Sequence, residues 1–294
     1  MKKLLMNRYV VLLGSFIFLT LLFTGCQTAK TEKTFRLGII PSENGQETLK
    51  QFSPLVAYLE ETMKVKVEPY VATDYNAVVE AMRTKHIDAA MFGPFSYIMA
   101  AERAGAEVCV VRVAGNGSPT YNSYFITHKG SGIKTLADLR GKALAYTDPA
   151  STSGYLVPAK VLLDNGISSR DFASVIYSNG HDASILAVKN KQVDAAAVDE
   201  MSYKRAVEKG IITKDEVAVF YTCPPIPQSP FAVAKDIDPA LRQKFVEAMT
   251  KVHELRPDAL KPLSASKYVT ATDENFQLIR DTAKALNLDL SKVK

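Results

Sequence analysis

The stretch "YNAVVEAMRTKHIDAAMFGPFSY", residues 75–97, decides the fold, because "HDASILAVKNKQVDAAAVDEMSY", residues 181–203, matches it without a gap. The Asp-Ala-Ala at 88–90 falls on the Asp-Ala-Ala at 194–196, at an offset of 106 residues. Solenoid repeats are far shorter than this. We therefore predict two copies of one supersecondary unit.

The two copies share the pattern of a βαβαβ unit. In each copy a short apolar run (37–40; 143–146) predicts a buried strand, and a helix, a strand, a helix and a third strand follow. The second helices are expected to begin at Tyr75 and His181. The first helices have apolar residues spaced for one buried face: Leu49, Phe52, Leu55, Val56 and Leu59; Leu156, Ala159, Leu162 and Leu163. The pattern predicts two α/β lobes with mostly parallel sheets.

The loops that follow the predicted strands indicate where a ligand would bind. In parallel sheets, ligands bind at the carboxyl ends of the strands, where loops lead into helix N-termini. Each copy contributes three such loops: 41–46, 72–76 and 93–97; 147–154, 179–183 and 199–203. Two lobes that face each other would bring all six loops to one cleft. The repeat therefore predicts a two-lobed clamp.

The segment "TDPASTSGYLVP", residues 147–158, places the hydroxyls of Ser151, Thr152 and Ser153 at a helix start. Helix N-termini offer unpaired N–H groups and the positive end of the dipole, which favours an oxyanion. Pro158 is tolerated in the first turn, so we expect the regular helix to begin near Gly154. These loops contain no obvious lysine or arginine, which indicates capture by neutral donors. The alternative is an ordinary helix cap.

Tyr75 and His181 occupy equivalent positions in the two copies, each at a helix start in the cleft. A tyrosine hydroxyl and an imidazole N–H are both suitable donors to an oxyanion, although each residue could instead serve packing. Asp199 stands where the first copy has Gly93. Its carboxylate could accept from a protonated ligand oxygen, pair with a ligand amine, or only cap a helix or mark a hinge.

The N-terminal residues 1–26 have the pattern of an export signal, in which Lys2, Lys3 and Arg8 precede an apolar stretch. The ending "LFTGC" resembles a lipobox, in which Cys26 is lipidated and becomes the mature N-terminus; a plain secretory peptide or an uncleaved anchor is the alternative. Residues 27–33 are polar and predict a flexible tether. We expect the domain to lie outside the cytoplasm.

Composition and motifs exclude several classes of function. Three of the 36 basic residues lie in the export segment, which leaves 33 against 31 acidic residues and no basic block, so nucleic acid is not an expected partner. A hydrolase using Ser151 or Ser153 with His181 is a second alternative, but no known hydrolase motif occurs. No catalytic residue, metal or cofactor is expected. Cys109 and Cys223 are expected to be buried small residues, and whether they pair stays open.

Several segments resemble the substrate-binding lipoproteins and periplasmic proteins of phosphonate, phosphite or phosphate ABC importers: "TDYNAVVEAMR", "IDAAMFGPFSY", "TYNSYFI", "LADLRGKALAYTDPASTSGYLVP" and "GHDASILAV". The similarity covers nearly all of residues 34–251. It implies an α/β type II periplasmic-binding-protein fold with two crossing strands, near 121–126 and 224–233. Lobe 1 would comprise 34–122 and 233–294, including the last helices, and lobe 2 would be inserted as 123–232.

The resemblance also implies a set of ligand-binding residues. The phosphonate group would be held by Ser151, Thr152, Ser153 and His181 from lobe 2, with Tyr75 and Tyr121 from the other lobe. In family members that bind aminoalkyl phosphonates, two carboxylates hold the ammonium. Asp199 has one of these places, whereas Gln228 or a neighbour has the other, which favours phosphite or methylphosphonate. Gly93 and Pro94 are further candidates.

The function that the resemblance implies is that of a solute-binding component of an ABC importer. Such a protein would capture a phosphorus oxyanion by lobe closure and deliver it to a permease and its ATPase. We expect a monomer that is lipid-anchored to the membrane. The alternatives are the same fold with a sulfonate, a thiamine precursor or a carboxylate as cargo, or a sensor ectodomain that feeds a histidine kinase.

Overall fold

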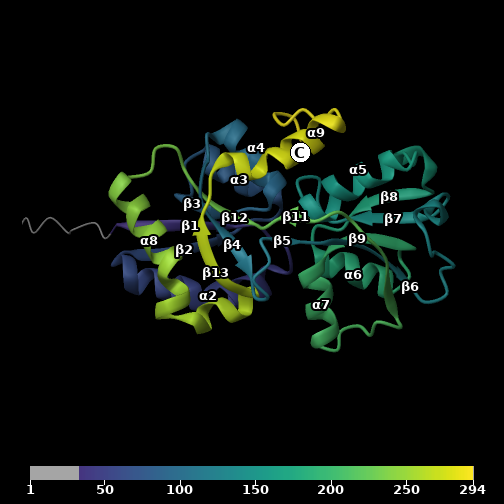
Figure 1. Ribbon diagram of the computed structural model, residues 1–294, viewed down its shortest axis with the longest axis horizontal. Helices are drawn as coiled ribbons and strands as arrows, with labels where there is room; N and C mark the ends of the chain where they lie inside the picture. Colours follow the sequence, from purple (N-terminus) through teal and green to yellow (C-terminus); the bar gives the residue numbers. More distant parts are fainter. Residues whose placement is uncertain (1–32, 294) are drawn as a thin grey trace, which may run out of the picture. The chain divides into compact units, whose positions relative to one another are not determined.

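The computed structural model describes residues 33–293 and contains two large sheets with a two-stranded ribbon between them (Figure 1). The predicted export signal, the lipidated Cys26 and nearly all of the tether lie outside the described residues. Within residues 33–293, no helix is long and apolar enough to cross a membrane.

The first sheet has six strands in the order β13-β4-β12-β3-β1-β2. The strand β1 lies between β2 and β3 and pairs with both in parallel, whereas β12, β4 and β13 add antiparallel pairings. Helices α2 and α8 pack on one face of this sheet, and α3 and α4 pack on the other. The bounds are β1 Thr34–Ile39, β2 Lys66–Val71, β3 Ala89–Met91, β4 Glu107–Ala114, β12 Pro230–Val233, β13 Ala265–Thr270, α2 Gly45–Met63, α3 Tyr75–Arg83, α4 Pro94–Ala104 and α8 Pro239–Leu255.

The second sheet has five strands in the order β10-β6-β9-β7-β8. The strand β7 pairs in parallel with β8 and β9, and β6 and β10 continue the sheet in antiparallel pairs. Helices α6 and α7 pack on one face and α5 on the other. The bounds are β6 Ser123–His128, β7 Ala143–Tyr146, β8 Ser174–Tyr177, β9 Ala195–Asp199, β10 Val217–Thr222, α5 Val157–Asp164, α6 His181–Lys189 and α7 Glu200–Glu208.

The predicted repeat is confirmed by the positions of the elements. Helix α3 covers 75–83 and α6 covers 181–189, so the two helices keep the 106-residue offset at both ends. The strands β1 and β7, each the second from one edge of its sheet, also have equivalent partners in the two sheets. We call the six-stranded sheet with α2, α3, α4 and α8 lobe 1, and the five-stranded sheet with α5–α7 lobe 2.

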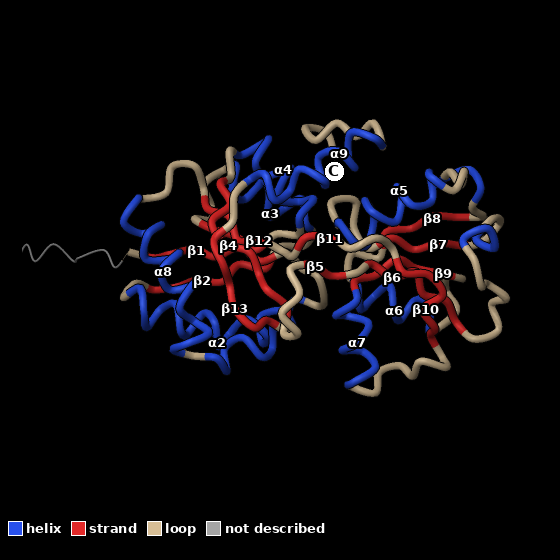
Figure 2. Tube along the Cα trace, viewed as in Figure 1, coloured by secondary structure: helices blue, strands red, loops and turns tan. Residues whose placement is uncertain are grey.

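Two short strands cross between the lobes, as the sequence implied. Strand β5 (Thr120–Tyr121) precedes the first strand of lobe 2 in the chain, and β11 (Ile226–Pro227) follows the last. They pair with each other in antiparallel fashion, between the two sheets (Figure 2). The fold is thus the α/β type II arrangement of two lobes with two crossing strands. The predicted residue boundaries of the lobes stay a prediction.

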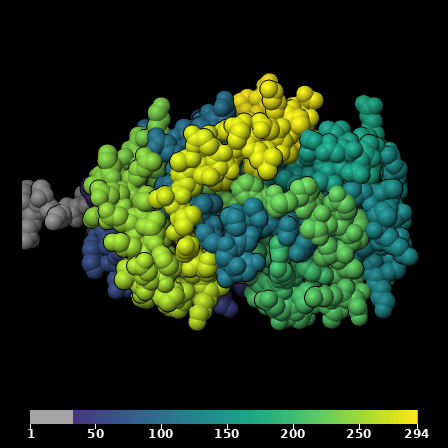
Figure 3. Space-filling model, viewed as in Figure 1, coloured from purple at the N-terminus to yellow at the C-terminus, as the bar shows by residue number. Residues whose placement is uncertain are grey.

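Two leucines that were expected on buried helix faces are exposed. Leu49 of α2 and Leu163 of α5 are 39% and 48% exposed, because the buried stripe of each helix runs through the neighbouring positions, Thr48 and Leu162. The last helix α9 (Gln277–Ala285), expected in lobe 1, packs against α4 of lobe 1 and also contacts α5 of lobe 2. In Figure 3 this C-terminal segment reaches the edge of the second lobe. Cys109 and Cys223 are free and buried.

Candidate ligand-binding site

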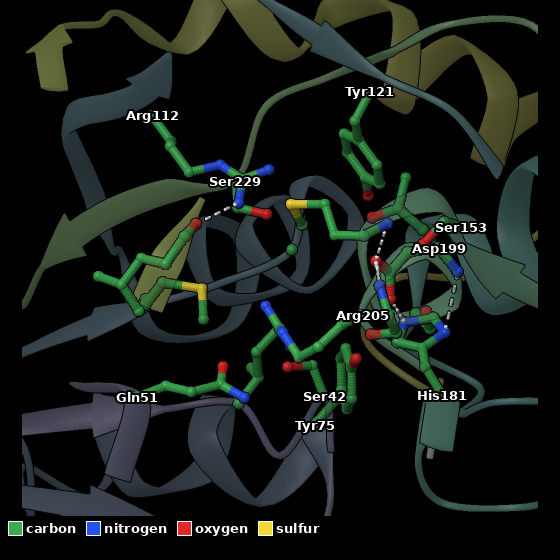
Figure 4. A pocket seen from close by; sticks show the side chains of 18 of the residues that line it. Ser42, Gln51, Tyr75, Arg112, Tyr121, Ser153, His181, Asp199, Arg205 and Ser229 are labelled. Carbon is green, nitrogen blue, oxygen red and sulfur yellow. Dashed lines mark hydrogen bonds and ion pairs between the residues drawn. The ribbon is translucent and has the colours of Figure 1, made fainter. Parts of the chain in front are cut away.

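A cavity of about 80 Å³ lies between the two lobes. All six predicted loops contribute to its wall, so the expected cleft is confirmed. Lobe 1 provides Ser42, Tyr75 and Gly93, and lobe 2 provides the hydroxyl segment 151–153, His181 and the start of α7. Figure 4 shows Ser42 and Tyr75 on one side of the cavity and Ser153, Asp199 and His181 on another.

The hydroxyl segment forms a π-helical turn, Thr152–Leu156, that leads into α5. The π-helical turn begins two residues before the expected Gly154, and the regular helix α5 begins three residues after it. Ser151 is the N-cap residue, and its Oγ accepts a hydrogen bond of 3.0 Å from the Gly154 N–H. The capping alternative is thus confirmed for Ser151. The same residue also lines the cavity, so the cap and the cavity wall are one feature.

The other two hydroxyl residues are anchored by neighbouring segments. The Oγ1 of Thr152 accepts from the Phe95 N–H of lobe 1 at 2.8 Å, and the backbone oxygen of Ser153 accepts from the Ser123 hydroxyl at 2.6 Å. Both side chains are buried and line the cavity. Because Thr152 uses a lone pair in its bond, its hydroxyl proton remains able to donate.

His181 is buried and has a fixed tautomer. Its Nδ1 accepts a hydrogen bond of 3.1 Å from the backbone N–H of Asp199, and the hydroxyl of Thr147 lies 3.0 Å from the same nitrogen. A nitrogen that accepts from an N–H carries no proton, so the proton of the neutral ring is on Nε2. That nitrogen lies 3.3 Å from Oδ2 of Asp199.

Asp199 caps helix α7. Its Oδ1 accepts from the backbone N–H groups of Met201 and Ser202, both at 2.8 Å. Burial raises the pKa of Asp199, but the electrostatic interaction with His181 and the hydrogen bonds from Ser202 outweigh this effect, and the net pKa lies below its ordinary value. The capping interpretation is therefore confirmed, and the second oxygen of this ionised carboxylate orients the imidazole.

Two tyrosines complete the ring of donors. Tyr75 lies at the start of α3 in lobe 1, and Tyr121 lies on the crossing strand β5. Burial raises the pKa of Tyr75 well above its ordinary value and raises that of Tyr121 to about 12. Both hydroxyls are therefore protonated at neutral pH and can donate. The nearby Ser151 lowers the pKa of Tyr75 and the nearby Ser153 lowers that of Tyr121, but burial outweighs both effects.

Two arginines of the cavity wall were missed by the sequence analysis. Arg205 lies on α7 one turn after Met201 and forms an ion pair with Glu43 of lobe 1. Helical spacing from the predicted helix start could have found it. Arg112 comes from β4 and is buried. No motif surrounds it, and only the meeting of β4 with the crossing segment brings it to the cavity.

Two of the further candidates do not line the cavity. Gln228 is turned away: its Oε1 accepts from the guanidinium of Arg112, and its Nε2 donates to the Thr120 oxygen at 2.7 Å. Its neighbour Ser229 lines the cavity instead. Pro94 is buried in the first turn of α4, outside the lining, whereas Gly93 lines it.

The chemistry of this wall suits a small anion. Hydroxyl groups, an imidazole N–H and two guanidinium groups are all hydrogen-bond donors. One water needs about 10–15 Å³ by the same measure of volume, so the cavity accommodates roughly five to eight heavy atoms. Residues 33–293 contain no group of three or more side chains suited to hold a metal ion.

Comparison with known proteins gives consistent results. Residues 37–276 match the family model described as "ABC transporter, phosphonate, periplasmic substrate-binding protein". The chain is 33% identical over 238 residues to the phosphonates-binding periplasmic protein of Escherichia coli, covering 79% of this chain and 70% of that protein. It is 34% identical over 226 residues to a phosphate-import protein of Mycolicibacterium smegmatis, covering 72% and 70%. A crystal structure of a binding-protein component of an ABC phosphonate transporter from Pseudomonas aeruginosa has a TM-score of 0.81, at 27% identity and 85% coverage of both chains.

Proposed function

Because the chain belongs to the family of periplasmic substrate-binding proteins of phosphonate ABC transporters, we propose that its interlobe cavity captures a phosphorus oxyanion for import. The ligand is a phosphonate, phosphite or phosphate. The observation that carries this proposal is the convergence of donors from both lobes on one small cavity. The hydroxyls of Ser151, Thr152 and Ser153 come from lobe 2, and that of Tyr75 comes from lobe 1.

The oxyanion would be held mainly by neutral donors. The three hydroxyls of the π-helical turn and the two tyrosine hydroxyls can each point a proton at a ligand oxygen, and His181 lines the cavity beside them. The turn adds the positive end of a helix dipole. Arg112 and Arg205 also line the cavity and make its wall more positive. Hydrogen bonds to charged groups are worth about 1.5–3 kcal/mol each, so this ring supports tight binding.

The site is built for binding and not for hydrolysis. In a serine hydrolase, an imidazole nitrogen has to accept the proton of the serine. In this structure Nδ1 of His181 already accepts from the Asp199 backbone, and its Nε2 carries the proton. The triad residue types are present, but the histidine has no nitrogen available to act as a base toward Ser151 or Ser153.

Capture would proceed by closure of the two lobes. A ligand that touches donors on both lobes favours the form in which they are close, and so shifts the balance toward that form. The closed form would then dock on a membrane permease that works with an ATPase. Members of this family act outside the cytoplasmic membrane, and we propose that lipid on Cys26 anchors this chain there.

Calorimetric titration of the mature protein tests the proposal. The ligands are phosphite, methylphosphonate, 2-aminoethylphosphonate, phosphate and sulfate. We expect a Kd of about 1 μM or lower for at least one phosphorus compound, as about −8 kcal/mol would give. The double variant Ser151→Ala/Thr152→Ala should weaken that binding at least about 100-fold, because it removes two charge-assisted hydrogen bonds.

The control is Ser168→Ala, which removes an exposed capping serine of lobe 2 outside the cavity and should bind as the wild type does. Absence of heat with every phosphorus compound, for a protein with the circular dichroism of the folded state, would overturn the proposal. Tighter binding of sulfate than of any phosphorus compound would assign the cavity to a different anion.

A further inference from the structure

The far side of the cavity carries a buried positive charge. Figure 4 shows Arg112 and Ser229 across the cavity from Ser153, Asp199 and His181. An oxyanion held by the hydroxyl segment would therefore have Arg112 on the opposite side of the cavity. We propose that Arg112 determines which substituent is accepted, an inference that rests on the proposed function. Arg112 favours a phosphonate whose substituent bears an anionic oxygen, such as a carboxylate, and disfavours a phosphonate whose substituent bears an ammonium.

The hydrogen bonds of Arg112 leave donors for a ligand. Its Nε donates to Oε1 of Gln228 at 2.9 Å, Nη2 donates to the same oxygen, and Nη1 donates to the Leu263 oxygen at 3.1 Å. A guanidinium has five N–H groups. Two N–H groups, one on each Nη atom, are therefore not used by these bonds.

The charge of Arg112 also has no carboxylate partner. Arg112 forms no ion pair with any of residues 33–293, although it is only 7% exposed. Burial lowers the pKa of Arg112 below its ordinary value, yet an arginine stays protonated at neutral pH. A buried charge without a partner is costly. A ligand oxygen with negative charge would provide the missing partner.

The acidic groups around the cavity are already engaged. Among the described residues that line it, Asp199 is the one acid, and both of its oxygens serve α7 and His181. Glu43 pairs with Arg205, and Glu200 pairs with Lys204. An ammonium on the ligand would thus meet no free carboxylate in the wall, and it would meet the like charge of Arg112.

There is room for a substituent on this side. A second cavity of about 300 Å³ shares Arg112, Tyr121, Met201 and Arg205 with the first. Its other lining residues are mostly polar: Asn116, Ser118, Thr120, Asn122, Glu200, Lys204 and the exposed Glu208 among them. A substituent that reaches Arg112 therefore continues into a polar space, and a charged oxygen there keeps contact with hydrogen-bond donors.

The test compares three phosphonates that differ only in their substituent, by calorimetric titration of the mature protein. These are phosphonoacetate with a carboxylate, 2-aminoethylphosphonate with an ammonium, and methylphosphonate with neither. We expect phosphonoacetate to bind at least tenfold more tightly than 2-aminoethylphosphonate. In Arg112→Met, the affinity for phosphonoacetate should fall at least tenfold more than the affinity for methylphosphonate.

Two further variants serve as controls for the effect of Arg112→Met. Arg112→Lys keeps the charge without the planar fork and should give an intermediate preference, which keeps the test informative if Arg112→Met does not fold. Arg103→Met removes a partly buried guanidinium of α4 that bonds Asn76 and Glu80 outside the cavity, and it should leave the preference unchanged.

The outcomes separate this inference from the proposed function. If methylphosphonate binds but phosphonoacetate binds no more tightly than 2-aminoethylphosphonate, the role of Arg112 is refuted and the proposed function stands. An equal loss for phosphonoacetate and methylphosphonate in Arg112→Met also refutes it, because the arginine would then act on the phosphonate group alone. If no phosphorus compound binds, the proposed function itself fails.

Discussion

At the scale of single residues, the cavity wall is made of side chains whose acceptor atoms are already occupied by backbone N–H groups. Ser151 accepts from Gly154, Thr152 accepts from Phe95, and Nδ1 of His181 accepts from Asp199. The two hydroxyls keep a proton for donation, and the proton of the His181 ring is on Nε2, beside Asp199. The polypeptide therefore turns side chains that could donate or accept into a surface that presents donors, which is what an oxyanion requires.

The charge of Asp199 is expected to stabilise the folded protein in a pH-dependent way. Its folded-state pKa lies below the ordinary 3.8, so ionised Asp199 adds stability that is fully present above about pH 4 and is lost as the pH falls through the folded-state pKa. Asparagine is an equally good cap, but it lacks the charge that holds His181. We expect Asp199→Asn to lower the free energy of unfolding by about 1–3 kcal/mol at pH 7.

Urea unfolding at pH 7, 5 and 3 measures this effect. The difference between wild type and Asp199→Asn should be similar at pH 7 and pH 5 and should shrink at pH 3. A difference of the same size at all three pH values would show that the carboxylate charge contributes nothing.

At the scale of elements, the π-helical turn before α5 depends on a glycine for space. The turn lies against the end of β7, and the Thr147 N–H donates to the Gly154 oxygen at 3.0 Å. A Cβ atom on Gly154 would lie 2.3 Å from Cβ of Thr147 and 2.9 Å from Oγ of Ser151. No real Cβ approaches other atoms so closely, so the turn could not keep this position with any other residue.

Gly154→Ala should therefore damage both the fold and the site. We expect a loss of about 1–3 kcal/mol in the free energy of unfolding, as for other overpacked positions. The ligand affinity should fall at least tenfold, because Thr147 and Ser151, which the new methyl group displaces, contact His181 and cap the turn. Thermal unfolding and calorimetric titration measure the two effects.

Gly45→Ala is the matched control, since a Cβ at that helix position meets its nearest atom at an ordinary 3.8 Å. It should leave both quantities almost unchanged. A Gly154→Ala protein that is as stable and binds as tightly as Gly45→Ala would contradict the close-packing argument.

At the scale of the two lobes, the structure shows direct contacts across the cleft. The N-termini of three helices of lobe 1 donate to side chains of lobe 2: Asn44 to Asp182 at 3.0 Å, Tyr75 to Asp148 at 3.2 Å and Phe95 to Thr152 at 2.8 Å. In return, the His181 N–H donates to the Ser42 oxygen at 2.9 Å. Two ion pairs, Glu43 with Arg205 and Glu47 with Lys209, lie alongside. The described structure is thus a closed form.

Asp182 tests whether these contacts stabilise closure. Its Oδ2 bonds the N–H at the start of α2, which is possible only when the lobes are closed. Removing it in Asp182→Ala should cost the closed form about 0.5–1.5 kcal/mol. Because the affinity of a clamp falls with the closed fraction, the ligand should bind about 2- to 12-fold more weakly.

Calorimetric titration of Asp182→Ala and of the control variant Asp164→Ala measures the ligand affinity of each. Asp164 forms an ion pair with Lys160 inside lobe 2, so its loss should not affect closure or affinity. Equal affinities for the two variants would mean that closure does not depend on the Asp182 contact.

The sequence by itself determined the two βαβαβ units, the cleft between them and the ring of hydroxyl donors. These features follow from local patterns: apolar spacing defines strands and helices, and a gapless repeat requires equivalent loops at equivalent ends of two sheets. Once the strands are parallel, their carboxyl ends meet, and Tyr75, Ser151–Ser153 and His181 come together without any detail of packing.

The tertiary structure alone decided the charges and orientations inside the cavity. Arg112 reaches the cavity because Gln228, 116 residues away in the chain, holds its guanidinium, and this contact also turns Gln228 away from the ligand. The contact of α9 with both lobes likewise joins elements distant in sequence. No local pattern encodes such meetings, since they depend on which side chains fill the space where separate strands and helices converge.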